Sequence, residues 1–132
     1  MTRKIIFYDG LCPFCNFWVN KIIKWDKEEV FFFASLQGET AELFFKENNI
    51  LVVPNSLIYW EENKSYALRS LAVFEIAKYL KGFAGLIVIF RFLPTFLTDG
   101  IYSFIAKNRF LFGQPFDACP MPSLDLKHRF LV

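Results

Sequence analysis

The chain has 132 residues, a length that fits one domain, and its 55% hydrophobic and 20% aromatic content, with 18 phenylalanines, excludes a disordered protein. Its 15 basic and 13 acidic residues are scattered and give a formal net charge of +2, so no basic patch predicts nucleic-acid binding. The apolar run near the N-terminus is too short for a secretory signal, which predicts a cytoplasmic location.

The first half of the chain alternates predicted strands and helices. Residues 5–8 (IIFY) form a short apolar run that ends at an Asp-Gly turn signal, which predicts a strand. Residues 13–27 carry apolar side chains three and four apart, the pattern of an amphipathic helix. Residues 30–34 (VFFFA) predict a strand covered on both faces, and residues 39–48 predict a second helix.

The second half predicts a hairpin followed by helices. Residues 56–60 (SLIYW) and 65–68 (SYAL) have the composition of two strands joined by a polar turn. Ser70 can cap the next helix, predicted over residues 71–80, and another helix is predicted over residues 95–107. The tail that follows shows no clear periodicity.

The predicted order βαβαββα is that of the thioredoxin fold. We therefore predict a single domain over residues 1–132, with a thioredoxin-like α/β core over about 3–82. A C-terminal helical extension over about 83–132 should pack against this core. Helices should cover both faces of the sheet, because parallel strands need right-handed helical crossovers.

The longest uncharged apolar run, residues 82–90 (GFAGLIVIF), ends at Arg91. Crossing a bilayer takes roughly 20 apolar residues, so this run is too short for a membrane span. The run predicts a buried element in preference to membrane contact through residues 83–96. An exposed docking surface over the same residues is the noncatalytic alternative, in which the protein is an interaction module.

Two cysteines, Cys12 and Cys15, lie at the start of the first predicted helix. Residues three apart on a helix share a face, with Cα atoms about 5–6 Å apart, within the range of a disulfide. Cys12 is the predicted nucleophile, because the unpaired N–H groups of a helix N-terminus favour a thiolate. Cys15, one turn deeper and less accessible, is the predicted resolving thiol. Pro13 suits the first helical turn, where its missing N–H is not needed.

Asp9, three residues before Cys12, has two interpretations. As a turn residue, its carboxylate would accept backbone N–H groups; as a catalytic residue, it would accept a proton from one of the thiols. The turn interpretation is preferred, because aspartate is common at such positions for that reason alone.

The segment Asp9–Cys15 (DGLCPFC) resembles the Asp-x-x-Cys-x-x-Cys signature of the DCC family, predicted thiol–disulfide oxidoreductases of thioredoxin-like type. Weaker matches to the family follow along the chain at Asn55–Ile58, Ser70–Ala72, Tyr102, Asn108–Phe110, Phe112–Gly113 and Arg129–Leu131. The resemblance implies a small redox protein that reduces or exchanges disulfides through Cys12 and Cys15. Its expected partner is a protein or small-molecule disulfide or dithiol, and no cofactor is expected.

Three residues are expected to face the substrate: Pro13, Phe14 and Pro54. In thioredoxins a cis-proline faces the dithiol just before the third strand, and Pro54 is the candidate for that place. A trans turn proline is an equal alternative at this position, because cis is a minority state for X–Pro bonds. The family often has aspartate where this chain has Asn55, so no carboxylate role is predicted there.

A zinc site is the competing interpretation of the cysteines. Cys12, Cys15, Cys119 and His128 together offer a Cys₃His ligand set, but the last two lack the short spacing of a second zinc knuckle. The metal site therefore ranks below the dithiol. Cys119 is predicted to be a loop or partly buried thiol, with a mixed disulfide to Cys12 as its alternative role.

Arg109 and Arg129 offer an anionic substrate two cationic partners. A structural role ranks higher, because both arginines lie beside phenylalanines over which their side chains can extend. The predicted ion-pair partners are Asp99, Asp117 and Asp125.

Overall fold

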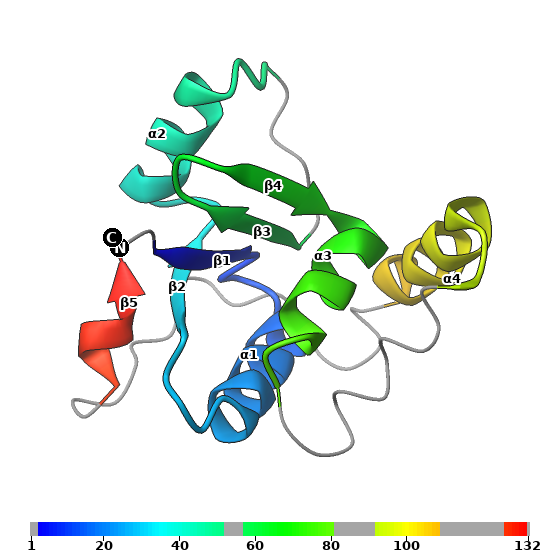
Figure 1. Ribbon diagram of the computed structural model, residues 1–132, viewed down its shortest axis with the longest axis horizontal. Helices are drawn as coiled ribbons and strands as arrows, with labels where there is room; N and C mark the ends of the chain where they lie inside the picture. The colour runs from blue at the N-terminus through cyan, green and yellow to red at the C-terminus, as the bar shows by residue number, and fades with distance from the viewer. Residues whose placement is uncertain (1–2, 52–56, 81–91, 109–125, 132) are drawn as a thin grey trace.

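The computed structural model describes residues 3–51, 57–80, 92–108 and 126–131, and its elements follow the predicted order (Figure 1). The elements are β1 (Lys4–Tyr8), α1 (Pro13–Trp25), β2 (Phe31–Ser35), α2 (Glu39–Glu47), β3 (Ile58–Glu61), β4 (Ser65–Leu68), α3 (Arg69–Ala77), α4 (Thr95–Lys107), the 3₁₀ turn η3 (Lys127–Arg129) and β5 (Phe130–Leu131). The mixed α/β fold with a thioredoxin-like βαβαββα order is confirmed.

The strands form one sheet with the order β4-β3-β1-β2-β5. β1 lies at its centre, parallel to β2 and antiparallel to β3, and β3 and β4 form the predicted hairpin. Because β1 and β2 are parallel, their carboxyl ends meet at one edge of the sheet, where Tyr8 pairs with Ser35. This edge is the place from which α1 starts.

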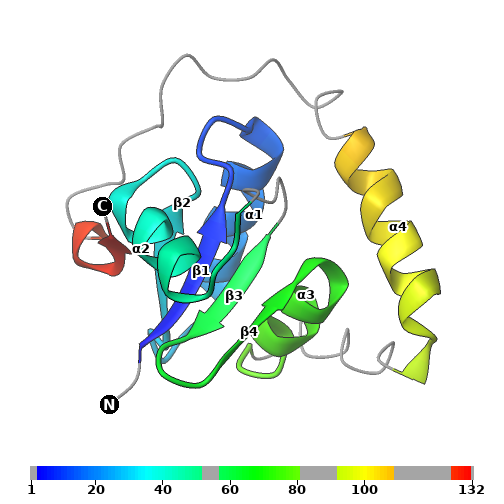
Figure 2. The same ribbon diagram turned by 90° about the horizontal axis from the view of Figure 1, so that it is seen from above.

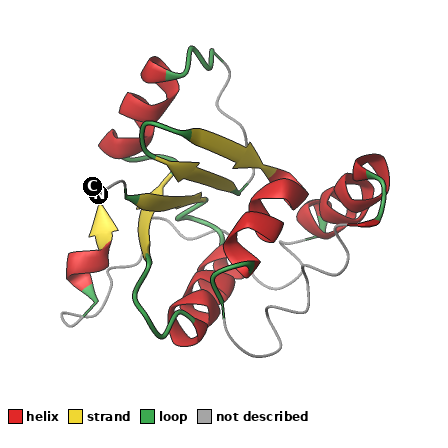
Figure 3. Cartoon of the chain, viewed as in Figure 1, coloured by secondary structure: helices red, strands yellow, loops and turns green. Residues whose placement is uncertain are grey.

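Helices cover both faces of the sheet, as predicted: α1 and α3 lie on one face and α2 on the other (Figures 1 and 3). Successive strand residues point to opposite faces, so the sheet divides the core into two clusters. The cluster under α1 and α3 contains Ile6, Tyr8, Val19, Ile22, Phe31, Phe33, Tyr59, Ala72, Ile76 and Leu80. The cluster under α2 contains Ile5, Phe7, Ala34, Leu36, Ala41, Phe44, Phe45, Ile58 and Trp60.

The end of the chain adds a strand that the sequence did not predict. β5 runs parallel to β2 and pairs Phe130 with Phe33, so it extends the sheet at the β2 edge. Arg129, just before β5, is buried and binds the buried carboxylate of Asp26. Its Nε also donates to the carbonyl of Phe31 at 3.2 Å. The preferred structural role of Arg129 is correct, and its partner is Asp26, which the sequence did not indicate. Of the three predicted aspartates, Asp117 and Asp125 lie outside the described residues.

α4 is the described helix of the predicted C-terminal extension, and it lies beside α3 on the side away from the sheet centre (Figure 2). Ser70 does not cap α3 as predicted, because α3 already begins at Arg69; its hydroxyl contacts the Thr98 hydroxyl at 3.1 Å and donates to the Asp99 carboxylate. The Tyr102 hydroxyl accepts the N–H of Leu57 at 2.8 Å. α4 is thus tied to both α3 and the start of β3.

α4 exposes large apolar side chains: Phe96, Leu97, Ile101, Phe104 and Ile105. Within the described ranges, no helix is long and apolar enough to cross a membrane. Residues 82–90, for which a buried element was predicted, lie outside the described part of the chain. The buried element therefore stays a prediction, with membrane contact or docking through residues 83–96 as its alternatives.

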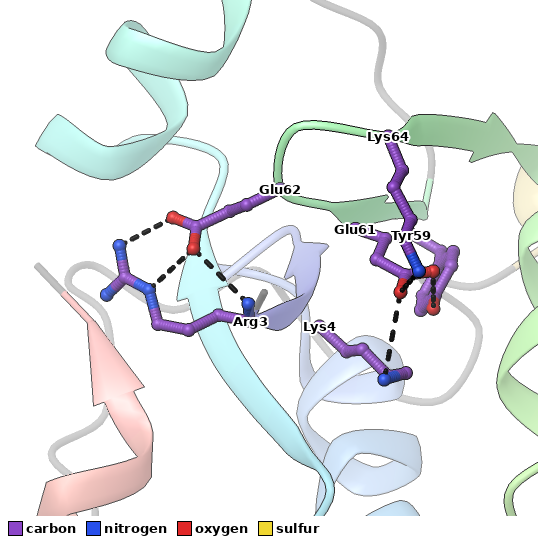
Figure 4. A network of polar contacts seen from close by, with 6 residues as sticks. All are labelled: Arg3, Lys4, Tyr59, Glu61, Glu62 and Lys64. Carbon is purple, nitrogen blue, oxygen red and sulfur yellow. Dashed lines mark hydrogen bonds and ion pairs between the residues drawn. The ribbon is translucent and has the colours of Figure 1, made fainter. Parts of the chain in front are cut away.

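A network of polar contacts joins the start of β1 to the β3–β4 hairpin (Figure 4). Arg3 binds Glu62 in a bidentate pair, with Nε–Oε2 and Nη2–Oε1 distances of 2.9 and 2.6 Å. The backbone of the same two residues is joined by the Glu62 N–H and the Arg3 carbonyl at 3.1 Å. The pair therefore holds the residue before β1 against the hairpin turn.

Replacing Glu62 with glutamine is expected to destabilise the protein by less than about 1 kcal/mol at pH 7, because the pair is partly exposed. The Arg3 hydrogen bonds lower the pKa of Glu62 below its ordinary value of 4.5. A lowered native pKa stabilises the fold above the unfolded pKa, and the contribution is lost as pH falls through the native value. Urea unfolding of wild type and Glu62→Gln should therefore converge in acid; an equal difference at pH 7 and at a pH below the native pKa would contradict this.

Candidate functional site

The two cysteines lie where β1 passes into α1, as the sequence predicts. Cys12 is the N-cap residue of α1, in an extended conformation, and Pro13 takes the first helical position. The Cys12 sulfur accepts the backbone N–H of Cys15 at 3.4 Å, so it occupies the place of an N-cap side chain. Neither Cys12 nor Cys15 is in a disulfide. The three-residue spacing places the two sulfurs on adjoining positions of one helical turn.

The exposure of the two cysteines is the reverse of the prediction. Cys12 is fully buried, with 0% of its surface exposed, whereas Cys15 is partly exposed and packs against the core under α1 and α3. The physical reason is the cap: because the Cys12 sulfur turns back to the N–H of Cys15, it points along the helix end instead of out into solvent. A substrate disulfide can therefore reach Cys12 only after a local movement.

The turn between β1 and Cys12 is built by Asp9, in agreement with the preferred interpretation. The Asp9 Oδ1 accepts the N–H of Leu11 at 3.1 Å, and the Asp9 carbonyl accepts the N–H of Cys12 at 3.2 Å. An aspartate side chain that binds the N–H two residues on forms an Asx turn. The turn role of Asp9 is thus directly visible, and its role as a proton acceptor stays a prediction.

Gln37 also holds this turn, and the sequence did not single it out. Its Nε2 donates to the Asp9 Oδ1 at 3.1 Å, and its Oε1 accepts the N–H of Gly10 at 3.3 Å. Its own N–H donates to the Ser35 hydroxyl at 3.2 Å. Gln37 follows β2, and the parallel pairing of β1 and β2 brings it beside the turn. Its place as a polar residue directly after the neighbouring parallel strand is the sequence feature from which its role could have been predicted.

Asn16, in the first turn of α1, is the second site residue that the sequence did not single out. Its Nδ2 donates to the carbonyl of Gly10 at 2.9 Å and to that of Cys12 at 3.0 Å. Both carbonyls belong to the segment that carries the nucleophile candidate. Gln37 and Asn16 therefore fix the Asp9–Cys12 turn from two sides, one from β2 and one from α1.

The electrostatics of the site come mainly from the helix end. The first turn of α1 contains no acidic residue, so the Cys15 N–H faces the Cys12 sulfur without a competing carboxylate on the helix. The partial positive charge of a helix N-terminus stabilises a thiolate placed against it. The arrangement can therefore support nucleophilic sulfur chemistry at Cys12.

The remaining predicted residues are only partly placed. Pro13 and Phe14 are half-buried, and the Phe14 ring meets the Trp18 ring edge-on at 6.2 Å between centroids. Pro54 and Cys119 lie outside the described residues. Whether Pro54 faces the dithiol therefore stays a prediction, as does the role of Cys119.

His128 lies at the opposite end of the sheet from the cysteines. It precedes Arg129, which binds the carbonyl of Phe31 at the start of β2, whereas Cys12 follows the far end of β1. The four residue-to-residue steps from Phe31 to Ser35 span about 13 Å at ~3.3 Å each, and zinc–ligand bonds are only about 2.0–2.3 Å long. His128 and Cys12 are therefore not brought to one metal site, and no cluster of three metal-binding side chains occurs in the described ranges.

The fold and site together define a thioredoxin-like α/β protein with a Cys-x-x-Cys dithiol at the N-terminus of its first helix. The family model of the DCC1-like thiol-disulfide oxidoreductases matches residues 6–114. The chain belongs to this family, whose name indicates a redox role.

Two relatives extend the similarity over most of the chain. The uncharacterized protein YuxK of Bacillus subtilis is 34% identical and covers 99% of this chain and 96% of its own length. A chloroplastic DCC family protein of Arabidopsis thaliana is 31% identical and covers 90% of this chain and 70% of its own length. No solved structure gives a significant match. Because one relative is chloroplastic, the cytoplasmic location of this chain stays a prediction.

Proposed function

We propose that the protein is a thiol–disulfide oxidoreductase in which Cys12 attacks and Cys15 resolves. The observation that carries the proposal is the Cys12 sulfur at the N-cap of α1, one helical turn from Cys15. Membership of the DCC1-like family supports it. The helix end favours the thiolate, which is the reactive form of the nucleophile.

In the reductive direction, the Cys12 thiolate attacks one sulfur of a substrate disulfide. The substrate S–S bond breaks, the leaving sulfur takes a proton, and Cys12 is held in a mixed disulfide. Cys15, deprotonated, then attacks the Cys12 sulfur and releases the second substrate thiol. The substrate gains two electrons and two protons, and the protein is left with a Cys12–Cys15 disulfide. The oxidative direction is the reverse of these steps.

The decisive experiment is a redox titration of the purified protein, assayed for zinc beforehand. The protein is equilibrated across a series of glutathione ratios, its free thiols are trapped by alkylation, and each cysteine is read by mass spectrometry. A reversible two-electron couple that joins Cys12 to Cys15 supports the proposal. Its midpoint sets the direction, since related dithiols span roughly −270 mV for reductants to −120 mV for oxidants. Stoichiometric zinc with both thiols protected would refute it.

Gln37→Ala is expected to slow disulfide exchange by about three- to tenfold, the equivalent of one or two hydrogen bonds. The physical reason is that Gln37 holds both the Asp9 carboxylate and the Gly10 N–H from the end of β2. Because its side chain is exposed, the free energy of unfolding should change by less than about 0.5 kcal/mol. Exchange rates with a small aromatic disulfide, and urea unfolding, measure the two quantities separately.

Gln37→Glu is the matched control for this prediction. It keeps the acceptor for Gly10 but replaces the amide donor with a carboxylate that faces Asp9, so it should not restore the rate at neutral pH. A Gln37→Glu protein with the full wild-type rate would show that the Asp9 contact does not position the dithiol.

A further inference from the structure

One side of α1 carries an aromatic strip, defined here as Phe14, Phe17, Trp18 and Trp25, that begins inside the cysteine motif. Neighbouring rings are in contact: centroid distances are 6.2 Å for Phe14–Trp18, 5.5 Å for Phe17–Trp18 and 6.4 Å for Trp18–Trp25. The strip is therefore a continuous row of rings from the dithiol toward the end of the helix, in which Phe14 and Trp25 are half-buried and Trp25 also packs against the core under α1 and α3.

The middle of the aromatic strip is open to solvent. Phe17 is 53% exposed and Trp18 is 43% exposed, whereas the opposite face of α1 buries Val19 and Ile22 in the core. The core therefore does not need Phe17 and Trp18 for its packing. Two adjacent, half-exposed aromatic rings next to a reactive group are typical of a binding surface, since aromatic side chains are enriched at interfaces.

The charge on the same face is positive. The Lys21 Nζ lies 5.4 Å from the centre of the Phe17 ring, Lys24 is in the last turn, and the sequence of α1 contains no acidic residue. Among the described residues, neither lysine has a carboxylate partner. A ligand that carries both apolar and acidic groups would therefore complement this face.

The length of the aromatic strip favours a polypeptide over a small disulfide. From residue 14 to residue 25 the helix rises about 16 Å at ~1.5 Å per residue. An extended chain covers this distance with about five residues at ~3.3 Å each, whereas a tripeptide spans only about 10 Å. A small disulfide such as oxidised glutathione would contact only the first part of the strip.

We propose that the aromatic strip is the docking surface for polypeptide substrates whose disulfide is flanked by an extended segment with apolar and acidic side chains. The inference deepens the proposed function and rests on it for the identity of the reacting group. The apolar segment lies on Phe17 and Trp18, and its acidic residues meet Lys21 and Lys24.

Binding is tested without any redox step. The probe is a fluorescein-labelled peptide of about ten residues, about 33 Å when extended, with Phe, Leu and Glu side chains and serines in place of its two cysteines. Fluorescence anisotropy should give a Kd that rises about tenfold in the Phe17→Ser/Trp18→Ser double variant, as expected for the loss of a central aromatic contact. Lys24→Gln should weaken binding less, and only at low salt.

The matched control is Leu43→Ser, which removes a 59% exposed apolar side chain from α2, on the other face of the sheet. It should leave the Kd unchanged. Equal Kd values for wild type and the double variant would overturn the docking surface.

Reduction assays separate this inference from the proposed function. With a cysteine-containing version of the peptide, the double variant should lose about tenfold in kcat/KM while its rate with oxidised glutathione is unchanged. If wild type binds the serine peptide as expected but reduces neither disulfide, the proposed function fails and the docking surface is kept. If both disulfides are reduced equally well by wild type and the double variant, the docking surface fails and the proposed function is kept.

Discussion

Cys15→Ser is expected to arrest the protein as a mixed disulfide between Cys12 and its substrate. Without the resolving thiol, the Cys12–substrate bond can be broken only by an external thiol, so the adduct accumulates in one-to-one stoichiometry. Turnover should fall on the order of a hundredfold or more, as expected when a nucleophilic mechanism loses one of its two groups. Intact-mass spectrometry after mixing with a disulfide peptide measures the adduct, and peptide mapping identifies the cysteine that carries it.

Cys12→Ser is the matched control, and the burial of Cys12 makes the comparison informative. Because Cys12 is fully buried and Cys15 is partly exposed, exposure alone would favour attack by Cys15. The N-cap position instead favours attack by Cys12. Both variants should carry Cys119→Ser, so that a third thiol does not form adducts. A faster adduct on Cys15 in the Cys12→Ser protein would reverse the two roles.

The order of elements was predictable because each one has a local signal. The strand-forming run of β1, the three- and four-residue spacing of α1 and the polar turn between β3 and β4 are all encoded within a few residues. β5 has no such signal, since it is two residues long and exists only by pairing with β2. The partner of Arg129 was missed for the same reason: Asp26 is 103 residues away in the sequence.

The site was predictable only where it is contiguous in sequence. The cysteine pair, the helix start at Pro13 and the Asp9 turn all lie in one short segment. Gln37 is 28 residues from Asp9 and reaches it through the parallel pairing of β1 with β2, so its role depends on the tertiary fold. The burial of Cys12 was missed because spacing indicates which helical face a side chain occupies, but not how the chain around it covers the sulfur.

Arg129→Met is expected to destabilise the protein by about 3–5 kcal/mol, the usual cost of removing one partner from a buried ion pair. Arg129 and Asp26 are each only 2% exposed, so the Asp26 carboxylate would be left in the interior without its cation. The substitution also removes the hydrogen bond to the Phe31 carbonyl and the contact of the guanidinium with the Phe33 ring, at 5.4 Å. Equilibrium unfolding in urea measures the loss.

Two comparisons show whether burial of the pair is the cause. Arg3→Met removes a partly exposed bidentate pair and should cost less than about 1 kcal/mol, and added salt should reduce that cost but not the cost of Arg129→Met. The double variant Asp26→Asn/Arg129→Met should lose less stability than the Asp26→Asn and Arg129→Met variants lose in total, because it leaves no unpaired charge. If the loss of stability in Arg129→Met is no larger than that in Arg3→Met, the Arg129–Asp26 pair does not hold β5 to β2. The position of β2, which leads to Ser35 and Gln37, would then depend on other contacts.

The double variant is a fair test because it keeps part of the local hydrogen bonding. The two carboxylate oxygens of Asp26 accept the N–H groups of Val30 and Phe31, each at 3.0 Å. The amide that Asp26→Asn introduces has one carbonyl oxygen, so it can still accept one of these two N–H groups. The double variant therefore removes the charge, while the turn that leads into β2 retains one of its two side-chain hydrogen bonds. The difference between its measured free energy of unfolding and the value expected from adding the two single losses gives the cost of the unpaired carboxylate.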